Sequence, residues 1–289
     1  MTSSPGQSST PSPAAAPSKA GRNLPAAIGV GVALGGFLIA VLLLVPDAWY
    51  AVVTVAIAIA TWEVTKRLRD GGFAVPVIPL LVGGQAIMWL SWPYGLAGSF
   101  VAMAATILVM MVWKLFAQGL SAAPVNYLRD LSVSTLVLAW LPVLATFGTY
   151  LVREDQGAYR VFTLVLVVVC SDVGGYAAGV LFGKHPMAPA ISPKKSWEGL
   201  GGSLLVGTLG AVACSLWLLD TPHWWIGFVL GPLLVLVATS GDLIESQIKR
   251  DLGIKDMGTL LPGHGGIMDR LDSLLPSAFV TWAVLALLL

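Results

Sequence analysis

Charged residues are scarce in this chain but concentrated between positions 240 and 273, where ten of its 31 charged residues lie within 34 positions. Four of these are carboxylates in two pairs, and the members of a pair, three residues apart, share one face of a helix. The pairs are Asp242 with Glu245 and Asp269 with Asp272. Between them lie three basic residues and a glycine-rich segment: Lys249, Arg250, Lys255 and residues 262–266. Carboxylates suit a divalent metal and basic groups suit phosphates, so this combination indicates phosphate chemistry at a membrane surface.

The acidic residues at the ends of two apolar segments are the candidate metal ligands. Asp242 closes one segment and Asp269 opens the next, so both are expected at a similar membrane depth. Mg²⁺ takes one or two carboxylates together with substrate phosphates. We therefore expect Asp242 and Asp269 to hold Mg²⁺ or Mn²⁺, with Asp172 and Asp272 as further candidates. For Asp269 and Asp272 the alternative is stabilisation of a helix N-terminus, which does not apply to Asp242.

The basic residues and the histidine of this segment also allow plainer explanations. Lysines and arginines of a cytoplasmic loop satisfy membrane topology and anionic headgroups without binding a substrate. Glu245 and Lys249 are four residues apart and could form only a salt bridge within a helix. His264, between two glycines, is either a hydrogen-bond donor to phosphate or a turn residue. A metal role for it is disfavoured because no second His or Cys lies nearby.

A second group of polar residues lies between positions 171 and 199. Glycines recur every fourth residue from Gly175 to Gly183, which predicts close packing against another helix of the same chain or of a second copy, so a homodimer stays open. Asp172, beside this stripe, needs a cation or a lysine as partner. Four side chains further on suit a phosphate cradle: Ser192, Lys194, Lys195 and Ser196. The chain contains no GxxxxGK[ST] and no GxGxxG, which excludes Walker-type and Rossmann-type nucleotide sites.

The composition identifies the elements that must position these residues. Hydrophobic residues make up 56% of the chain and charged residues 11%, against about 25% in soluble domains, so we expect an all-α polytopic membrane protein. Residues 1–22, rich in Ser, Pro and Ala, are expected to form a disordered cytoplasmic tail. The net charge of +1 and the lack of a basic stripe disfavour a nucleic-acid partner. Cys170 and Cys214 lie in apolar runs and are expected to be buried free thiols.

Nine apolar segments are long enough, or nearly so, to span a membrane. They lie near 24–44, 47–62, 74–92, 96–116, 131–151, 161–182, 200–219, 224–245 and 271–289. With a cytoplasmic N-terminus, 14 of the 16 lysines and arginines fall on the cytoplasmic side. The long loops 183–199 and 246–270 then share that face and can build one site. We expect N-terminal helices over 23–160 and a catalytic region over 161–289.

The charged segment resembles the signature of phosphatidate cytidylyltransferases, also called CDP-diacylglycerol synthases. The matching residues are SxIKR at 246–250, KDxG at 255–258 and LPxHGGIxDRLD at 261–272. The earlier SDxGxY at 171–176, FGK at 182–184 and SPKKSWEG at 192–199 are also similar to that family. The resemblance covers residues 170–275, whereas the first 160 residues resemble the family only as a set of spans.

The resemblance implies a plasma-membrane enzyme that converts CTP and phosphatidic acid to CDP-diacylglycerol and pyrophosphate on the cytoplasmic face, with a divalent metal at Asp242 and Asp269. The residues then expected in catalysis are Lys194, Lys195, Lys249, Arg250, Asp269 and Arg270. Those expected to bind substrate are Ser192, Lys194, Lys195, Ser196, Lys255, His264, Gly265 and Gly266. A cytidylyltransferase acting on another lipid phosphate is the first alternative. A transporter or ion channel is the second, although its acidic residues should be spread through mid-depth positions.

Overall fold

The computed structural model describes residues 24–121, 123–219, 223–261 and 265–289, and these residues are almost entirely helical. Its helices before the strands are α1 (Leu24–Leu44), α2 (Pro46–Asp70), α3 (Val77–Gln118), α4 (Tyr127–Leu138), the π-helical turn η1 (Ala139–Val143), α5 (Leu144–Arg153) and α6 (Gly157–Phe182). Strands β1 (Pro186–Ala188) and β2 (Ser192–Ser196) form an antiparallel hairpin. The remaining helices are α7 (Trp197–Trp217), α8 (Ile226–Asp251), α9 (Met268–Leu271) and α10 (Leu274–Leu288). The expected all-α membrane architecture is confirmed.

The nine expected apolar segments each coincide with a helical segment of the described chain. Within the described residues, seven helical stretches are long and apolar enough to span a membrane, and α1 contributes a shorter apolar stretch, Ala33–Leu44. One of the seven, α3, supplies two segments because the chain reverses at Gly95, whose φ of 63° is readily adopted only by glycine. The reversal brings Gly83 against the side chain of Thr106 and lets the Ser99 hydroxyl donate to the carbonyl oxygen of Ile87.

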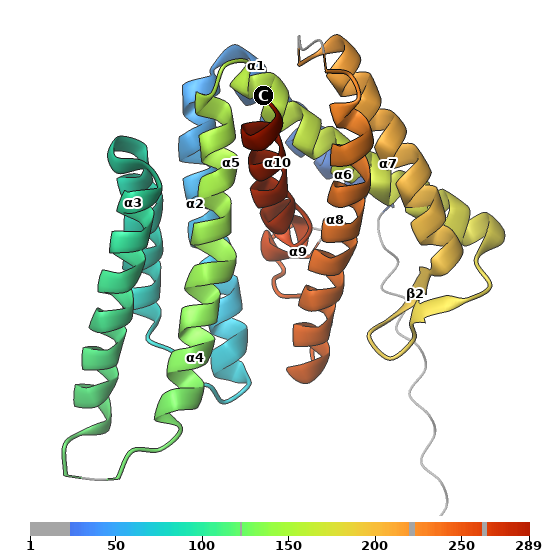
Figure 1. Cartoon of the computed structure of the whole chain (residues 1–289). Coiled ribbons are helices and arrows are strands. Elements are labelled where there is room, and N and C mark those ends of the chain that lie inside the picture. Colours follow the sequence, from blue (N-terminus) through green and yellow to red (C-terminus); the bar gives the residue numbers. More distant parts are fainter. Residues whose placement is uncertain (1–23, 122, 220–222, 262–264) are drawn as a thin grey trace, which may run out of the picture.

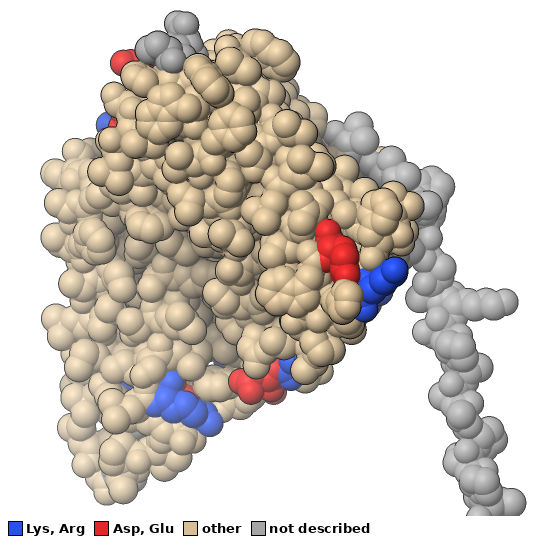
Figure 2. Space-filling view, turned by 45° about the vertical axis from the view of Figure 1, so that its right-hand side comes forward, with Lys and Arg blue, Asp and Glu red and all other residues tan. Residues whose placement is uncertain are grey.

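The loops alternate between the two ends of the helices, as the nine-segment topology requires. The chain segments that follow α2, α3 and α8 lie at the lower end with the β-hairpin, whereas the turn within α3 and the C-terminus lie at the upper end (Figure 1). Charged side chains gather mainly along the lower edge of the molecule, and most of the visible surface is uncharged (Figure 2). The two loops with motif residues therefore do share one end.

One boundary differs from the expectation and changes the site. The expected eighth segment ends at 245, but α8 continues to Asp251 and stops where Gly253 adopts a φ of 67°. Residues 246–250 favour continuation because none of them is Gly or Pro. Lys249 is therefore a helical residue facing Glu245 one turn earlier, and the loop that follows runs only from 252 to 267.

Glycines let α6 and α7 pack almost backbone to backbone. A methyl group on Gly202 would collide with the side chain of Ala178 and lie 2.5 Å from the carbonyl oxygen of Gly174, while Gly199 lies against Gly175 and Gly179. The glycine stripe of α6 is thus covered by α7 of the same chain. The expected close helix packing is confirmed, and the helix that packs on the stripe belongs to the same chain and not to a second copy.

Two adjacent glycines of α7 make this packing testable. We expect Gly202→Ala to lower the melting temperature in detergent, because overpacking costs about 1–3 kcal/mol. Gly201→Ala should be neutral or slightly stabilising, since no atom lies within 4 Å of the added methyl group and alanine favours a helix. Equal melting temperatures for the two variants would contradict the close approach of α6 and α7.

Candidate active site

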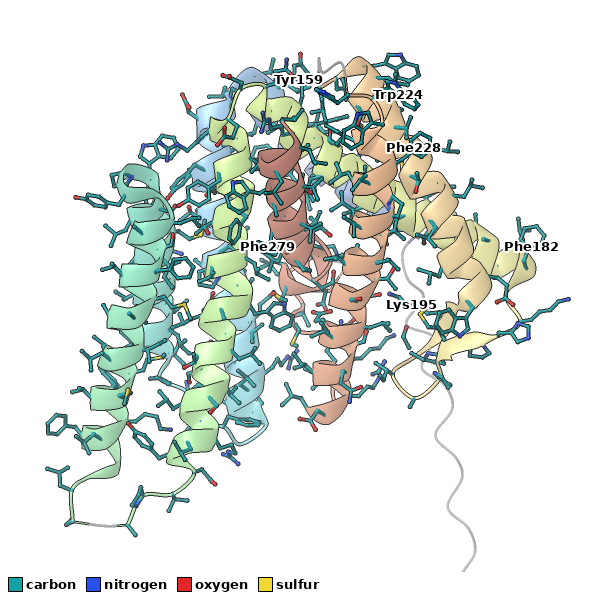
Figure 3. The ribbon with its side chains drawn as sticks, viewed as in Figure 1. Tyr159, Phe182, Lys195, Trp224, Phe228 and Phe279 are labelled. Atoms are coloured by element: carbon teal, nitrogen blue, oxygen red, sulfur yellow. The ribbon has the colours of Figure 1, made fainter. Side chains whose placement is uncertain are left out.

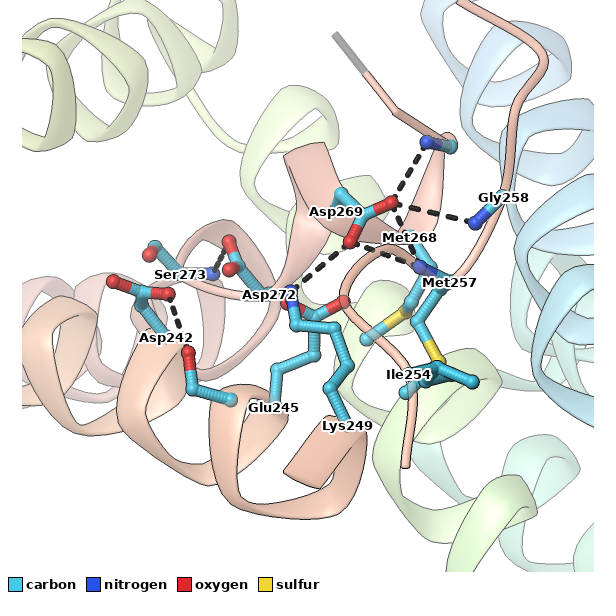
Figure 4. Close-up of polar contacts among 12 residues, drawn as sticks. Asp242, Glu245, Lys249, Ile254, Met257, Gly258, Met268, Asp269, Asp272 and Ser273 are labelled. Atoms are coloured by element: carbon cyan, nitrogen blue, oxygen red, sulfur yellow. Dashed lines mark hydrogen bonds and ion pairs between the residues drawn. The ribbon is translucent and has the colours of Figure 1, made fainter. Parts of the chain in front are cut away.

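Three carboxylates from two separate segments meet at the lower half of α8. Asp242 and Glu245 come from α8 and Asp272 follows α9, and one oxygen of each lies within 4.8 Å of the others (Figure 4). Gly241 permits this meeting, because a side chain there would collide with the carbonyl oxygen of Asp272. Glu245 and Asp272 are buried, and Oε1 of Glu245 has no hydrogen-bond partner among the described residues. We call Asp242, Glu245 and Asp272 the carboxylate cluster.

Two lysines border the carboxylate cluster. Lys195, from the β-hairpin, places its Nζ 2.5 Å from Oδ2 of Asp242 on the side of the hairpin that faces α8 (Figure 3). Lys249 is buried between Glu245, with which it forms an ion pair, and Asp269, whose Oδ1 is 3.0 Å away. Among the described residues, Lys195 and Lys249 are the ammonium groups that pair with the cluster and with Asp269, so four carboxylates share two lysines and favour further positive charge.

Asp269 is engaged differently from the expectation that paired it with Asp242. Its oxygens accept hydrogen bonds from the backbone N–H groups of Met257, Gly258 and Gly266, at 3.1, 3.4 and 2.7 Å, in addition to the ion pair with Lys249. Asp242 instead meets Glu245 and Asp272. The physical reason is that Asp269 closes the 252–267 loop onto itself, while Asp272, three residues later, faces α8. In the structure Asp242 thus lies closest to Glu245 and Asp272, and the metal role expected for Asp242 and Asp269 stays a prediction.

The glycines of the signature make room for carboxylates of the chain itself. Gly265 has a φ of 84°, and a side chain there would lie 2.8 Å from Oδ2 of Asp269. Gly258 and Gly266 both lie against the carboxylate of Glu63, where a methyl group would collide with it. Glu63 reaches the loop from α2, is buried, and accepts a hydrogen bond of 3.0 Å from the N–H of Met268.

Glu63 and its neighbour on α2 were missed by the sequence reasoning. One turn beyond Glu63, Arg67 donates through Nε to the carbonyl oxygen of Met257 at 2.9 Å, so two side chains of α2 hold the loop. The available signal was the ionisable Glu63 directly after an apolar segment that was expected to end at 62, a position that by default indicates function. The sequence placed Glu245 among the carboxylates that mark function but did not identify it as a candidate metal ligand.

The contact between Glu63 and Gly266 predicts a compensating pair of substitutions. Gly266→Ala should lower the melting temperature and the activity, because the methyl group displaces the buried carboxylate at a cost of about 1–3 kcal/mol. In a Glu63→Ala background the same change should cost much less, since the colliding group is gone. Additive effects in this double-mutant cycle, measured by thermal denaturation, would contradict the proposed contact.

Among the described residues, the remaining predicted residues form no ion pair with the cluster. Arg250 donates to the carbonyl oxygens of Ile191 and Ile254, at 3.2 and 3.1 Å, and so ties the β-hairpin to the end of α8. Ser196 caps α7 by accepting the N–H of Gly199 at 3.1 Å. Asp172, exposed on α6, is within electrostatic range of Lys195 and Asp242.

The other candidates differ in exposure and in whether the structure describes them. Ser192 is half-buried in β2. Three exposed cations form no ion pair among the described residues: Lys194, Lys255 and Arg270. His264 lies outside the described residues.

The fold and this polar site define a polytopic membrane protein with carboxylates and lysines collected near one end of its helices. The chain matches the cytidylyltransferase family over residues 25–288, and it belongs to that family. A phosphatidate cytidylyltransferase of Mycobacterium bovis is 53% identical over 285 residues, covering 96% of this chain and 92% of the relative. The corresponding protein of Mycobacterium leprae is 52% identical over 282 residues, covering 93% and 90%. One from Synechocystis is 46% identical over 133 residues, 43% of each chain.

Proposed function

We propose that this protein transfers the cytidylyl group of CTP to phosphatidic acid, giving CDP-diacylglycerol and pyrophosphate for phospholipid synthesis. Relatives that match nearly the whole chain are phosphatidate cytidylyltransferases, which supports this assignment. The observation in the structure that carries it is the meeting of the carboxylate cluster with lysines from two distant segments at one end of the helices. Such a site suits two anionic substrates, one of which is anchored in lipid.

The chemistry requires little from the protein beyond positioning and charge. An oxygen of the phosphate monoester forms a bond to the α-phosphorus of CTP, and the bond from that phosphorus to the oxygen bridging to the β-phosphate breaks, so pyrophosphate leaves. A phosphate monoester has a second pKa of about 6 and is already largely anionic at neutral pH. No general base is then required, and catalysis comes from aligning the two anions and offsetting their repulsion.

The basic residues divide into two roles in this proposal. Lys194, Lys255 and Arg270 are exposed cations free to contact phosphate oxygens, and Lys195 lies at the accessible edge of the cluster. Arg250 is a positioning residue, because its contacts hold the β-hairpin that carries Lys194 and Lys195. Ser192 lies in the hairpin segment, and Gly265 and Gly266 lie in the segment before α9. His264, outside the described residues, is proposed to donate a hydrogen bond to phosphate because of its position between two glycines of the signature.

The carboxylate cluster suits a divalent metal ion by the chemistry of its donors. All three ligand groups are carboxylates, and the buried Oε1 of Glu245 lacks a partner among the described residues. Hard oxygen donors of this kind suit Mg²⁺, and Mn²⁺ is the alternative. Asp242, Glu245 and Asp272 would hold the ion, with Asp172 nearby, and Asp269 would keep the adjoining loop in place. The ion would supply charge neutralisation for the triphosphate.

The orientation in the membrane is part of the proposal. Lysine and arginine residues concentrate in the loops at the lower end, which favours the cytoplasmic side of the plasma membrane for that end and for the site. CTP would then enter from the cytoplasm, and the headgroup of phosphatidic acid would enter laterally with its acyl chains in lipid. Cysteine-accessibility labelling of Lys184→Cys and Glu154→Cys in intact cells should show opposite sidedness. Labelling of both from one side would contradict this topology.

Pyrophosphate release by the purified protein tests the function. We expect release that requires both CTP and phosphatidic acid, stops with EDTA, and does not occur with ATP, GTP or UTP. A panel of lipid phosphates tests the alternative substrate class: release with another lipid phosphate but not with phosphatidic acid would transfer the assignment to that lipid. No release from folded protein with any combination would contradict nucleotide transfer altogether.

A further inference from the structure

A polar cavity lies beside α2, on a face next to the one that carries Glu63 and Arg67. Its volume is about 380 Å³, and it is lined by Trp62, Thr65, Lys66, Arg69, Asp70 and Val77. Trp62, Lys66 and Arg69 follow the i, i+4, i+7 spacing of one helix face, whereas Glu63 and Arg67 follow the same spacing toward the loop. The cavity is therefore distinct from the carboxylate cluster.

The cavity is lined by two basic residues and one acidic residue, so its lining carries a net positive charge. Lys66 and Arg69 form no ion pair among the described residues, although Nζ of Lys66 lies 5.4 Å from the ring centroid of Trp62. The carboxylate of Asp70, also in the lining, has its own counterion in Arg67 at 3.8 Å. The lining thus favours an anion.

The start of α3 adds hydrogen-bond donors to this charge. Val77 lines the cavity and is the first residue of α3, and Pro76 before it provides no side-chain cap. Pro79 has no N–H, and the N–H of Leu80 donates to the carbonyl oxygen of Pro76. The N–H groups of Val77 and Ile78 are therefore the ones without an intrahelical acceptor, and their partial positive charge suits phosphate oxygens. The fully buried Thr65 lies at the floor of the cavity, and the exposed Trp62, Lys66 and Arg69 form its rim.

The depth of the cavity points to a lipid headgroup. Trp62, half exposed, ends the apolar part of α2, and tryptophan is typical of the membrane interface. Lys66 and Arg69 lie about 6 and 10 Å further along the helix axis, which is the headgroup layer. We propose that this cavity binds the phosphate of an anionic phospholipid, with the acyl chains passing Trp62, as a site separate from the active site.

Native mass spectrometry of the full-length protein in detergent tests this site with phosphatidylglycerol, which is not the proposed substrate. The wild type should retain one phosphatidylglycerol per chain more tightly than phosphatidylcholine with the same acyl chains. Lys66→Ala/Arg69→Ala should weaken retention roughly tenfold or more, given the contribution of each basic residue near an anionic headgroup. Lys184→Ala removes an exposed cation at the same end outside the cavity and should leave retention unchanged.

Three outcomes would overturn the proposal. Retention by the double variant equal to the wild type would remove the cavity as the lipid site, and an equal loss in Lys184→Ala would reduce the effect to overall surface charge. Displacement of phosphatidylglycerol by millimolar inorganic phosphate would assign the cavity to a soluble anion. Pyrophosphate release from CTP and phosphatidic acid checks that the double variant is folded. If it is not, Lys66→Gln and Arg69→Gln are compared singly, each with an expected loss of roughly threefold or more.

Discussion

Replacing Asp272 with Asn should lower CTP-dependent turnover about a hundredfold or more while leaving the protein folded. The substitution removes a carboxylate from the cluster with Asp242 and Glu245, and losses of this size follow when a group that binds a metal or stabilises developing charge is removed. The hydrogen bond of 2.6 Å from the N–H of Ser273 to Oδ1 can be kept by the asparagine. Because the substitution removes one of three neighbouring negative charges, the melting temperature in EDTA should stay equal or rise.

Asp269→Asn and Asp251→Asn are the matched comparisons for Asp272→Asn. Asp269 holds the loop through three backbone N–H groups and Lys249, so Asp269→Asn should lower the melting temperature as well as the activity. Asp251 is exposed at the end of α8, so Asp251→Asn should alter neither the melting temperature nor the activity. Near-normal turnover by Asp272→Asn would remove Asp272 from the active site and favour the pairing of Asp242 with Asp269.

Replacing Lys249 with Met should have the largest effect on stability. Its Nζ bridges the carboxylates of Glu245 and Asp269, and all three residues are buried. Removing one partner of a buried ion pair leaves unpaired charge and costs about 3–5 kcal/mol. We expect a fall in the melting temperature in detergent on the order of 10 °C, because each kcal/mol lowers it by a few degrees.

Lys184→Met is the control for Lys249→Met, since it removes an exposed ammonium group without breaking an ion pair of the described chain. A second variant, Lys249→Met/Glu245→Gln, should recover part of the loss because one unpaired carboxylate is neutralised. A melting temperature for Lys249→Met within a degree of the wild type would show that the bridge is not formed in the protein. It would also weaken the position assigned to Asp269.

The helices and the ends at which the motifs lie were predictable because their causes are local. A run of about 20 apolar residues predicts a membrane-spanning helix, as for α6 and α8, whatever the rest of the chain contains. Each span takes the chain to the other side, so the number of spans determines at which end each loop lies. The glycine stripe from Gly175 to Gly183 also indicated close packing, because only residues without side chains allow backbones to approach. The partner helix, α7, followed from the structure alone.

What the sequence by itself determined is the chemistry available: carboxylates, basic residues and glycines at fixed spacings in two segments of a membrane protein. Only the tertiary structure decided which carboxylates meet. Gly241 lets Asp272 approach α8, and Glu63, some 200 residues earlier, fills the space left by Gly258 and Gly266. Helical periodicity specifies the face on which a side chain lies, but the register between two helices depends on contacts between residues distant in sequence, which no local pattern contains.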